Sequence, residues 1–254
     1  MTILCKQDYQ APSGLLKGRV ILVTGAGDGI GRSAALHYAA HGATVLLLGR
    51  TTSKLEKVYD EIEAAGGPQP AILPLNLEGA TSHDYQDVAT KIDETFGRLD
   101  GLLQNAGILG QRAPLEHYDE QTWLKVMQVN LHAPVMLTQA MIPLLRQAPD
   151  PSIILTSSGV GRTARAYWGA YAISKFGIEG LNQLLADELS SEGKQVRVNA
   201  INPGATRTGM RVLAYPGEPP AQNPSPDEIM GTYLYLMGPD SQGVTGQQFD
   251  AQQR

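Results

Sequence analysis

Residues 19–31 read RVILVTGAGDGIG and join an apolar run directly to a cluster of glycines. The part Arg19–Thr24 is typical of a buried strand, and Ile30–His41 has the pattern of a helix. Glycine lets a backbone approach phosphate closely, and a helix N-terminus offers N–H donors and a positive dipole end. A flexible turn is the plainer alternative, but it would not need so many glycines. The stretch predicts a nucleotide-phosphate site formed by Gly25, Gly27, Asp28, Gly29, Ile30 and Gly31.

Short apolar runs alternate with helical patterns along the rest of the chain. The predicted strands are Arg19–Thr24, Thr44–Leu48, Ala71–Leu75, Leu99–Gln104, Ser152–Thr156, Val196–Ile201 and a last one near Gln247–Asp250. The predicted helices are Ile30–His41, Lys54–Ala65, Tyr85–Phe96, Glu120–Arg146 with a bend or break at Pro134 and Pro143, and Gly169–Leu189. Continuous apolar strands separated by helices indicate a parallel sheet covered on both faces. We predict an α/β, doubly wound Rossmann fold with about seven parallel strands.

The length of 254 residues suits a single domain, 1–254, because no repeat or break in composition divides the chain. Residues 1–16 form an N-terminal extension. Residues 204–226, within the proline- and glycine-rich stretch Pro203–Pro226, form a substrate-loop region. Such a stretch is either a lid or a disordered loop, and the lid is favoured because binding loops follow the carboxyl ends of the strands.

Composition excludes several classes of partner. A net charge of -5 argues against nucleic acid and anionic membranes as partners. The single cysteine, Cys5, cannot form an internal disulfide, and no stretch is apolar enough to span a bilayer. The five histidines lack metal-site spacing, so no metal is predicted. We expect a soluble, cytoplasmic protein that acts on a small molecule.

Tyr171 and Lys175 are four residues apart and so share one face of the predicted helix. A lysine ammonium beside a phenol favours the phenolate and lowers the tyrosine pKa, which prepares the tyrosine to exchange a proton near neutral pH. Such a pair also arises by chance on many helices. The serines Ser157 and Ser158 lie just upstream, and either hydroxyl could assist or merely satisfy nearby backbone.

The residue after the second strand bears on cofactor choice. NAD-binding sites commonly place a carboxylate there to hold the ribose hydroxyls, whereas this chain has Arg50. An arginine can pair with a 2′-phosphate. Arg50 could also be a solvated residue after a strand. The sequence favours NADP(H), with NAD(H) as the alternative.

These motifs together resemble the short-chain dehydrogenase/reductase family in order and spacing. They are the glycine loop, Asn105-Ala106-Gly107, Asn130, Ser158, Tyr171, Lys175 and Asn202-Pro203-Gly204. Ser158 precedes Tyr171 by 13 positions (171 − 158), as the family's serine usually does. The resemblance runs from Lys17 to Phe249, and residues 24–32 and 245–251 look most like the YciK-type oxidoreductases of that family.

The resemblance implies a role for each matched residue. Tyr171 would be the general acid or base, Ser158 would bond the substrate oxygen, and Lys175 would hold the nicotinamide ribose and depress the tyrosine pKa. Asn130 would anchor a proton-relay water, although it could simply be a local hydrogen-bonding residue in its helix. The remaining cofactor contacts would come from Asn76, Leu77, Asn105, Ala106, Gly107, Pro203, Gly204 and Thr206. The family would also imply a homodimer or homotetramer formed through helices flanking the site.

The chain departs from the family pattern at Asp28, where NADP-linked members often carry a basic residue, at Asn76, where an aspartate is common, and at Gln104, where an asparagine is frequent. The predicted function is NADP(H)-dependent hydride transfer between the nicotinamide and a carbonyl or secondary alcohol, with 3-oxoacyl-thioester reduction as a narrower version. The alternative is a catalytically silent NAD(P)-binding sensor or scaffold. A methyltransferase also uses glycine loops but has no use for the Tyr171–Lys175 pair.

Overall fold

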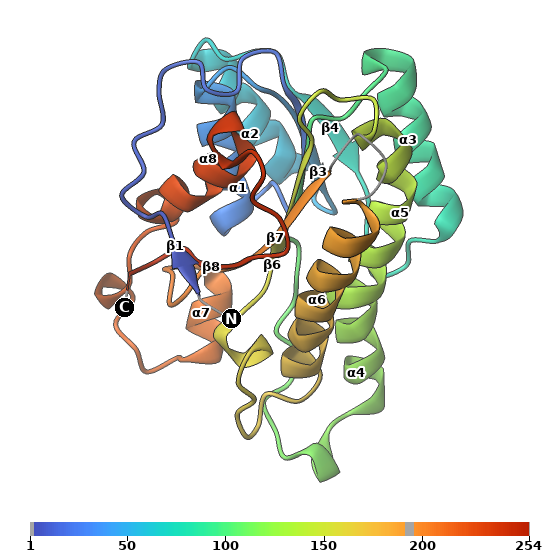
Figure 1. Cartoon of the computed structure of the whole chain (residues 1–254). Helices are drawn as coiled ribbons and strands as arrows, with labels where there is room; N and C mark the ends of the chain where they lie inside the picture. Colours follow the sequence, from blue (N-terminus) through green and yellow to red (C-terminus); the bar gives the residue numbers. More distant parts are fainter. Residues whose placement is uncertain (1–2, 191–195, 254) are drawn as a thin grey trace.

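A single parallel sheet lies between two layers of helices in the computed structural model, which describes residues 3–190 and 196–253 (Figure 1). The strands are β1 (Leu4–Cys5), β2 (Val20–Thr24), β3 (Thr44–Gly49), β4 (Ala71–Pro74), β5 (Gly101–Gln104), β6 (Ser152–Thr156), β7 (Arg197–Asn202) and β8 (Gln248–Asp250). Their order is β1-β8-β7-β6-β5-β2-β3-β4, and the neighbours in this order run parallel to each other. The doubly wound fold predicted from the sequence is confirmed.

The sheet has eight strands rather than about seven. The extra strand is β1, which comes from the N-terminal extension and pairs with β8 so that Leu4 lies beside Phe249. A strand of two residues carries no alternation in its sequence, so periodicity could not predict it. The first two residues of the predicted extension lie outside the described part of the chain.

Helices cover both faces of this sheet (Figure 1). They are α1 (Gly29–Ala40), α2 (Thr52–Ala64), α3 (Ser82–Phe96), α4 (Glu120–Met127), α5 (Ala133–Leu145), α6 (Gly169–Glu188), α7 (Gly209–Ala214) and α8 (Met230–Met237). Single 3₁₀ turns lie at Leu115–His117, Gly159–Gly161, Pro220–Gln222, Asp227–Ile229 and Pro239–Ser241. In the described part of the chain, no helix is both long and apolar enough to cross a membrane.

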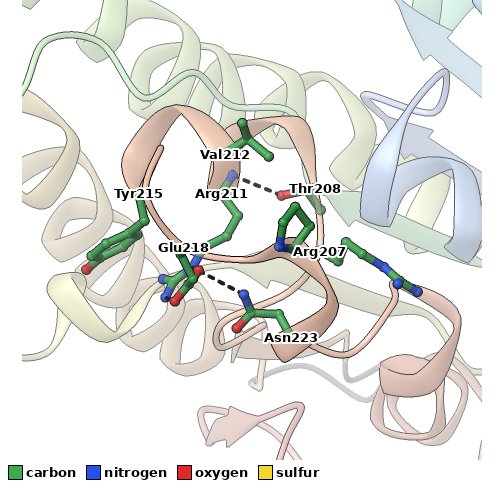
Figure 2. Close-up of a pocket in the computed structure, with 8 residues that line it drawn as sticks. Arg207, Thr208, Arg211, Val212, Tyr215, Glu218 and Asn223 are labelled. Carbon is green, nitrogen blue, oxygen red and sulfur yellow. Dashed lines mark hydrogen bonds and ion pairs between the residues drawn. The ribbon is translucent and has the colours of Figure 1, made fainter.

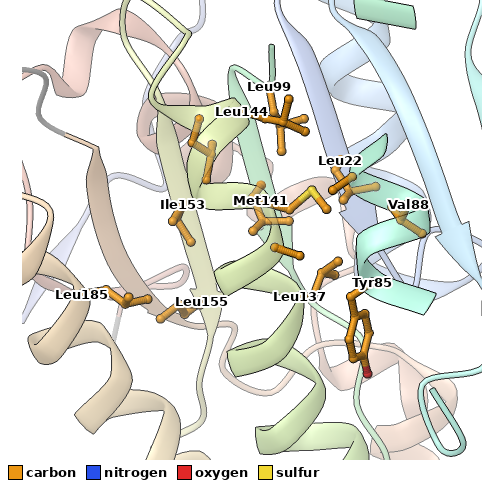
Figure 3. Close-up of a cluster of buried hydrophobic side chains, with 14 of the residues drawn as sticks. Leu22, Tyr85, Val88, Leu99, Leu137, Met141, Leu144, Ile153, Leu155 and Leu185 are labelled. Carbon is orange, nitrogen blue, oxygen red and sulfur yellow. The ribbon is translucent and has the colours of Figure 1, made fainter. Parts of the chain in front are cut away.

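Alternation along each strand sends apolar side chains into two separate cores. In β2, Leu22 packs toward α3 and α5, while Ile21 and Val23 pack toward α1 and α8. All three are fully buried, which explains why the strand reads as apolar throughout. Figure 3 shows the first core, where Leu137 and Met141 of α5 lie among side chains from β2, β6 and α3.

The predicted long helix Glu120–Arg146 is interrupted. The break is a π-helical turn, η2 (Gln128–His132), between α4 and α5. Pro134 closely follows this turn, in the first turn of α5, and Pro143 lies within that helix. A π turn often marks a functional position, and Asn130 is at the centre of this one.

The chain reverses its winding direction next to β2. From β2 it proceeds to β3 and β4 on one side, and it then crosses to β5 and β6 on the other. A crevice opens at the carboxyl ends of the strands at such a switch point. The glycine loop follows β2, and Asn105–Gly107 follows β5, so the fold brings both predicted motifs to this crevice.

Candidate active site

A cavity of about 590 Å³ extends along the carboxyl ends of the strands. It begins beside Arg50 and Asn76 and ends at Tyr171 and Lys175. The predicted residues that line it are Gly25, Gly27, Asp28, Gly29, Ile30, Arg50, Asn76, Leu77, Asn105, Ala106, Gly107, Ser158, Tyr171, Lys175, Pro203, Gly204 and Thr206. Gly31 and Asn130 are not among the lining residues. The topology therefore gathers positions far apart in sequence along one elongated site.

Gly31 does not line the cavity, but it allows the glycine loop to pack closely against the start of α1. A Cβ atom on Gly31 would lie 2.2 Å from the carbonyl oxygen of Gly25, which leaves no room for a side chain. Gly25 itself has φ +68°, a conformation that costs glycine little and other residues much. The loop folds back on itself tightly, and the surface that remains toward the cavity is mostly backbone. Such a backbone cradle fits a diphosphate group.

Thr24 joins the two sides of the switch point. Its Oγ1 accepts hydrogen bonds from the backbone N–H of Asn105 at 2.9 Å and of Ala106 at 3.0 Å, and it donates to the Leu103 carbonyl at 3.3 Å. The Asn105 side chain donates back to the Thr24 carbonyl at 3.3 Å. The motif after β5 thus fixes the position of the glycine loop.

The acidic residue in the glycine loop is neutralised by its surroundings. The Asp28 carboxylate caps α1 by accepting from the Gly29 N–H at 2.7 Å, and it pairs with the Lys54 ammonium. The Lys54 bond, more than the backbone bond, holds the Asp28 pKa below its usual value. Lys54 also lines the cavity next to Arg50, and the Arg50 side chain makes no ion pair or hydrogen bond within the described chain. Asp28 therefore leaves this end of the cavity cationic.

Ser158 reaches Tyr171 because the turn that follows the serine packs directly on α6. A Cβ atom on Gly161 would lie 2.6 Å from the Lys175 Cβ, so only glycine permits this approach. The Ser158 hydroxyl forms a hydrogen bond with the Tyr171 phenol. The neighbouring Ser157 is buried and its Oγ has no partner among the described residues. Of the two candidate serines, Ser158 is the one that contacts the tyrosine.

Burial reverses the expected effect of Lys175 on Tyr171. Tyr171 is 8% exposed, and desolvation raises its pKa, with the Ser158 hydrogen bond acting in the opposite direction. Lys175 is also buried, and burial lowers its pKa to about 8, opposed by the charge of Glu179. The ammonium donates to the Thr156 carbonyl at 2.7 Å and lies 5.7 Å from the centre of the tyrosine ring. The sequence predicted a lowered Tyr171 pKa, whereas in this structure desolvation dominates.

Asn130 connects three parts of the site from the π turn. Its Oδ1 accepts from the Ile108 N–H at 2.8 Å, and its Nδ2 donates to the Ile108 carbonyl at 2.9 Å and to the Ser174 hydroxyl at 3.2 Å. Its Oδ1 and the Lys175 Nζ lie 3.4 and 3.8 Å from the same point, where a Gly107 Cβ would be. Asn130 is therefore more than a local hydrogen-bonding residue, since it holds the strand-end loop against α6.

The end of the cavity near Tyr171 has apolar walls that the sequence did not predict. They are formed by Leu109, Trp168, Met210, Leu213 and Ala214. Trp168 lies 5.7 Å from Tyr171 between ring centres, and both belong to one small apolar cluster. No sequence pattern marks these positions, because they come from three separate segments.

The predicted substrate loop 204–226 contains the short helix α7 and a single turn at Pro220–Gln222, and its side chains make contacts with one another. The Arg211 guanidinium donates two hydrogen bonds of 2.6 Å to the Glu218 carboxylate, which also accepts from Asn223 at 2.8 Å (Figure 2). The small pocket between these side chains, separate from the large cavity, encloses about 10 Å³, roughly enough for one water. The Arg211 charge is therefore paired within the loop.

The comparisons with known proteins agree with this geometry. Residues 19–218 match the family profile of short chain dehydrogenases. The chain belongs to the short-chain dehydrogenase/reductase family. It is 51% identical over 244 residues to the uncharacterized oxidoreductase YciK of Escherichia coli K12, covering 96% of each chain.

Two solved structures of short-chain dehydrogenases are also close. A putative member from Pseudomonas syringae is 58% identical, with a TM-score of 0.94, covering 96% of this chain and 99% of that one. One from Escherichia coli CFT073, solved in complex with NADPH, is 52% identical, with a TM-score of 0.92, covering 95% of this chain and 100% of that one. The protein is thus an oxidoreductase that uses a nicotinamide cofactor.

The cavity fits the cofactor of a short-chain dehydrogenase/reductase. The glycine backbone cradle suits the diphosphate, and the cationic end beside Arg50 suits the adenosine half. At the other end the buried Ser157 lines the cavity, and its Oγ lacks a partner among described residues. In the described part of the chain, no cluster of three or more potential metal ligands occurs.

Lys175 makes the stability of this short-chain dehydrogenase/reductase depend on pH. Its pKa falls from 10.5 to about 8 on folding, so between those values the unfolded chain holds more protons and stability rises with pH. In Lys175→Met this rise of stability with pH should be absent. The difference in unfolding free energy between wild type and variant should therefore change by about 3 kcal/mol between the two pKa values. Urea unfolding at pH 7 and 10.5 measures this change.

The control for this experiment is Lys91→Met on the exposed face of α3. That variant should keep the wild-type pH dependence. A constant offset between Lys175→Met and wild type between the two pKa values would contradict a buried, weakly basic lysine.

Proposed function

We propose that the protein transfers a hydride between NADP(H) and a carbonyl or secondary alcohol, with Tyr171 as the general acid or base. The observation that carries the proposal is the hydrogen bond between Ser158 and the Tyr171 phenol at the buried end of a cavity that starts at the glycine loop. Lys175 lies directly behind this pair. A proton donor, an oxygen-binding hydroxyl and a cation at one end of a dinucleotide-sized cavity suit carbonyl reduction.

NADP(H) is preferred over NAD(H) because the far end of the cavity is cationic. Arg50 and Lys54 both line it, and the Arg50 guanidinium has no competing partner within the described chain. A 2′-phosphate would find a planar, multiply donating group there. The NADPH complex of the relative from Escherichia coli CFT073 supports the same preference.

The chain's own residues would handle the proton and the oxygen. The bound nicotinamide would supply or accept the hydride. In reduction the Tyr171 phenol would give its proton to the carbonyl oxygen, and the Ser158 hydroxyl would donate a hydrogen bond that stabilises the developing charge. Lys175 would hold the ribose and favour the resulting phenolate. Asn130 would anchor a water that returns a proton toward Lys175.

The walls around Tyr171 favour a substrate with apolar substituents. Leu109, Trp168 and Met210 line the cavity and pack in one apolar cluster with Tyr171. Leu213 of α7 also lines the cavity and is 73% exposed. An apolar group bound there would remove this surface from water. The segment 204–226 would then be a substrate lid rather than a disordered loop.

The proposal is tested by titrating the protein with NADPH and NADH and by following NADPH oxidation with two sets of substrates. The sets are apolar ketones and 3-oxoacyl thioesters. We expect tighter binding of NADPH and turnover with at least one apolar carbonyl. Tight NADPH binding with no turnover across both sets would instead indicate a catalytically silent sensor or scaffold. Failure to bind either cofactor would reject both functions.

We also propose that the protein forms a homodimer or homotetramer through α4 and α6, which lie side by side (Figure 1). These helices expose Leu124 (54%), Ile173 (50%), Phe176 (40%) and Leu184 (53%). Apolar patches of this kind mark association surfaces. Phe176→Glu should convert the oligomer to a monomer in size-exclusion chromatography with light scattering. The same change at Val212, which is 49% exposed on α7 and belongs to neither helix, should leave the mass unaltered.

A further inference from the structure

The side chain of Gln252, close to the C-terminus, bonds almost entirely to one segment of the site. Its Nε2 donates to the carbonyls of Pro203 at 2.7 Å and Ala205 at 3.1 Å, and to the hydroxyl of Thr206 at 3.1 Å. An amide group has two N–H donors, and both are directed at this segment. Gln252 does not line the cavity, so any influence on the reaction would pass through the residues it holds.

The segment 203–206 depends on Gln252 for its shape. Gly204 has φ +75°, and a Cβ atom placed on it would lie 2.9 Å from the Gln252 carboxamide, so the two groups are in direct contact. The segment's own bonds are the Gly204 N–H to the Asn202 Oδ1 at 3.1 Å and the Thr206 hydroxyl to the Pro203 carbonyl at 3.1 Å. Pro203, Gly204 and Thr206 line the cavity near its catalytic end.

The N-terminal segment in turn holds the C-terminal residues in place. The Gln7 Oε1 accepts from the Gln253 N–H at 2.7 Å, and the Asp8 carboxylate accepts from the Gln253 side chain. Strand β1 pairs with β8 just before these contacts. Gln7 also packs on α8, since a Cβ atom on Gly231 would lie 2.2 Å from the Gln7 carbonyl oxygen. The extension therefore reaches the site through Gln253 and Gln252.

We propose that Gln252 is a positioning residue for the nicotinamide half of the cofactor and that the N-terminal segment, through Gln7, keeps Gln252 in place. The inference rests on the proposed function, because it takes Pro203–Thr206 as the nicotinamide-binding segment. Without the carboxamide, two carbonyls and a hydroxyl would lose a shared donor, and the glycine between them would gain freedom. The adenosine half binds at the opposite end of the cavity and does not depend on these bonds.

The experiment compares two probes in wild type and in Gln252→Ala. NADPH reports on the whole site, and adenosine 2′,5′-bisphosphate, which lacks the nicotinamide half, reports on the adenosine end alone. We expect Gln252→Ala to weaken NADPH binding about tenfold and to leave the bisphosphate within about twofold. Gln252→Glu keeps the size but places a carboxylate against three oxygen acceptors, so it should weaken NADPH binding at least as much.

Gln7→Ala should show the same selectivity with a smaller effect, about threefold. The matched control is Gln10→Ala, because Gln10 is exposed on the same segment and its side chain bonds only to the nearby Asp8 carbonyl. Equal weakening of both probes, or no change in Gln252→Ala, would overturn the inference while leaving the proposed function intact. A wild type that fails to bind NADPH would reject the proposed function itself.

Discussion

Replacing Tyr171 with phenylalanine should lower kcat for carbonyl reduction by about 10³-fold and change the affinity for NADPH by less than about twofold. The phenol is the group hydrogen-bonded to Ser158, and its ring is already buried, so the variant removes the transferable proton without opening a cavity. Single-turnover measurement of NADPH oxidation with a saturating ketone separates the chemical step from binding.

The matched control is Tyr167→Phe. Tyr167 is four positions away, 55% exposed, and outside the residues that line the cavity. Its loss of a hydroxyl should leave kcat unchanged. Near-normal turnover in Tyr171→Phe would contradict its role as the proton donor, even if NADPH still bound.

Much of the fold could be predicted because the sheet is buried on both faces. Continuous apolar runs such as residues 20–24 and 152–156 are too short for a buried helix and suit a strand covered on both sides, and the glycines at 25–31 fix where the first helix begins. Helix α8 (Met230–Met237) escaped prediction because it is apolar on every side and therefore has no helical period. Strand β1 escaped because its two residues are a strand only by virtue of pairing with β8.

The catalytic side chains could be located from the sequence, but their protonation could not. The spacing of Tyr171 and Lys175 places both on one helix face, and the structure brings Ser158 to them. The pKa direction depends on burial, and no local pattern says that α6 packs so closely on Gly161 that Lys175 is almost fully buried. Desolvation then outweighs the attraction between the pair.

The remaining features of the site that could not be predicted depend on contacts between residues distant in sequence. Lys54 neutralises Asp28 from a neighbouring helix, and Gln252 reaches the segment after β7 from the end of the chain. Neither residue belongs to a motif. Their positions follow from tertiary packing, which periodicity and spacing do not encode.

Replacing Arg50 with alanine should weaken NADPH binding by about 30-fold and NADH binding by less than about twofold. The reason is that charge-assisted hydrogen bonds to a 2′-phosphate contribute about 1.5–3 kcal/mol, whereas NADH has no group at that position. Arg50 is exposed and free of competing carboxylates in the described chain, so its removal should not disturb folding. Fluorescence titration with each cofactor at low and high salt measures the effect.

Arg32→Ala is the matched control, because Arg32 is also an exposed arginine but pairs with Glu61 and does not line the cavity. Its affinity for both cofactors should match that of wild type. Arg50→Lys should fall between wild type and Arg50→Ala, since an ammonium keeps the charge but loses the planar, bidentate geometry. The NADPH affinity of wild type should fall more steeply with salt than that of Arg50→Ala, because salt screens the exposed Arg50 charge. Equal weakening of NADPH and NADH in Arg50→Ala would show that Arg50 supports the adenosine pocket in general and does not recognise the 2′-phosphate.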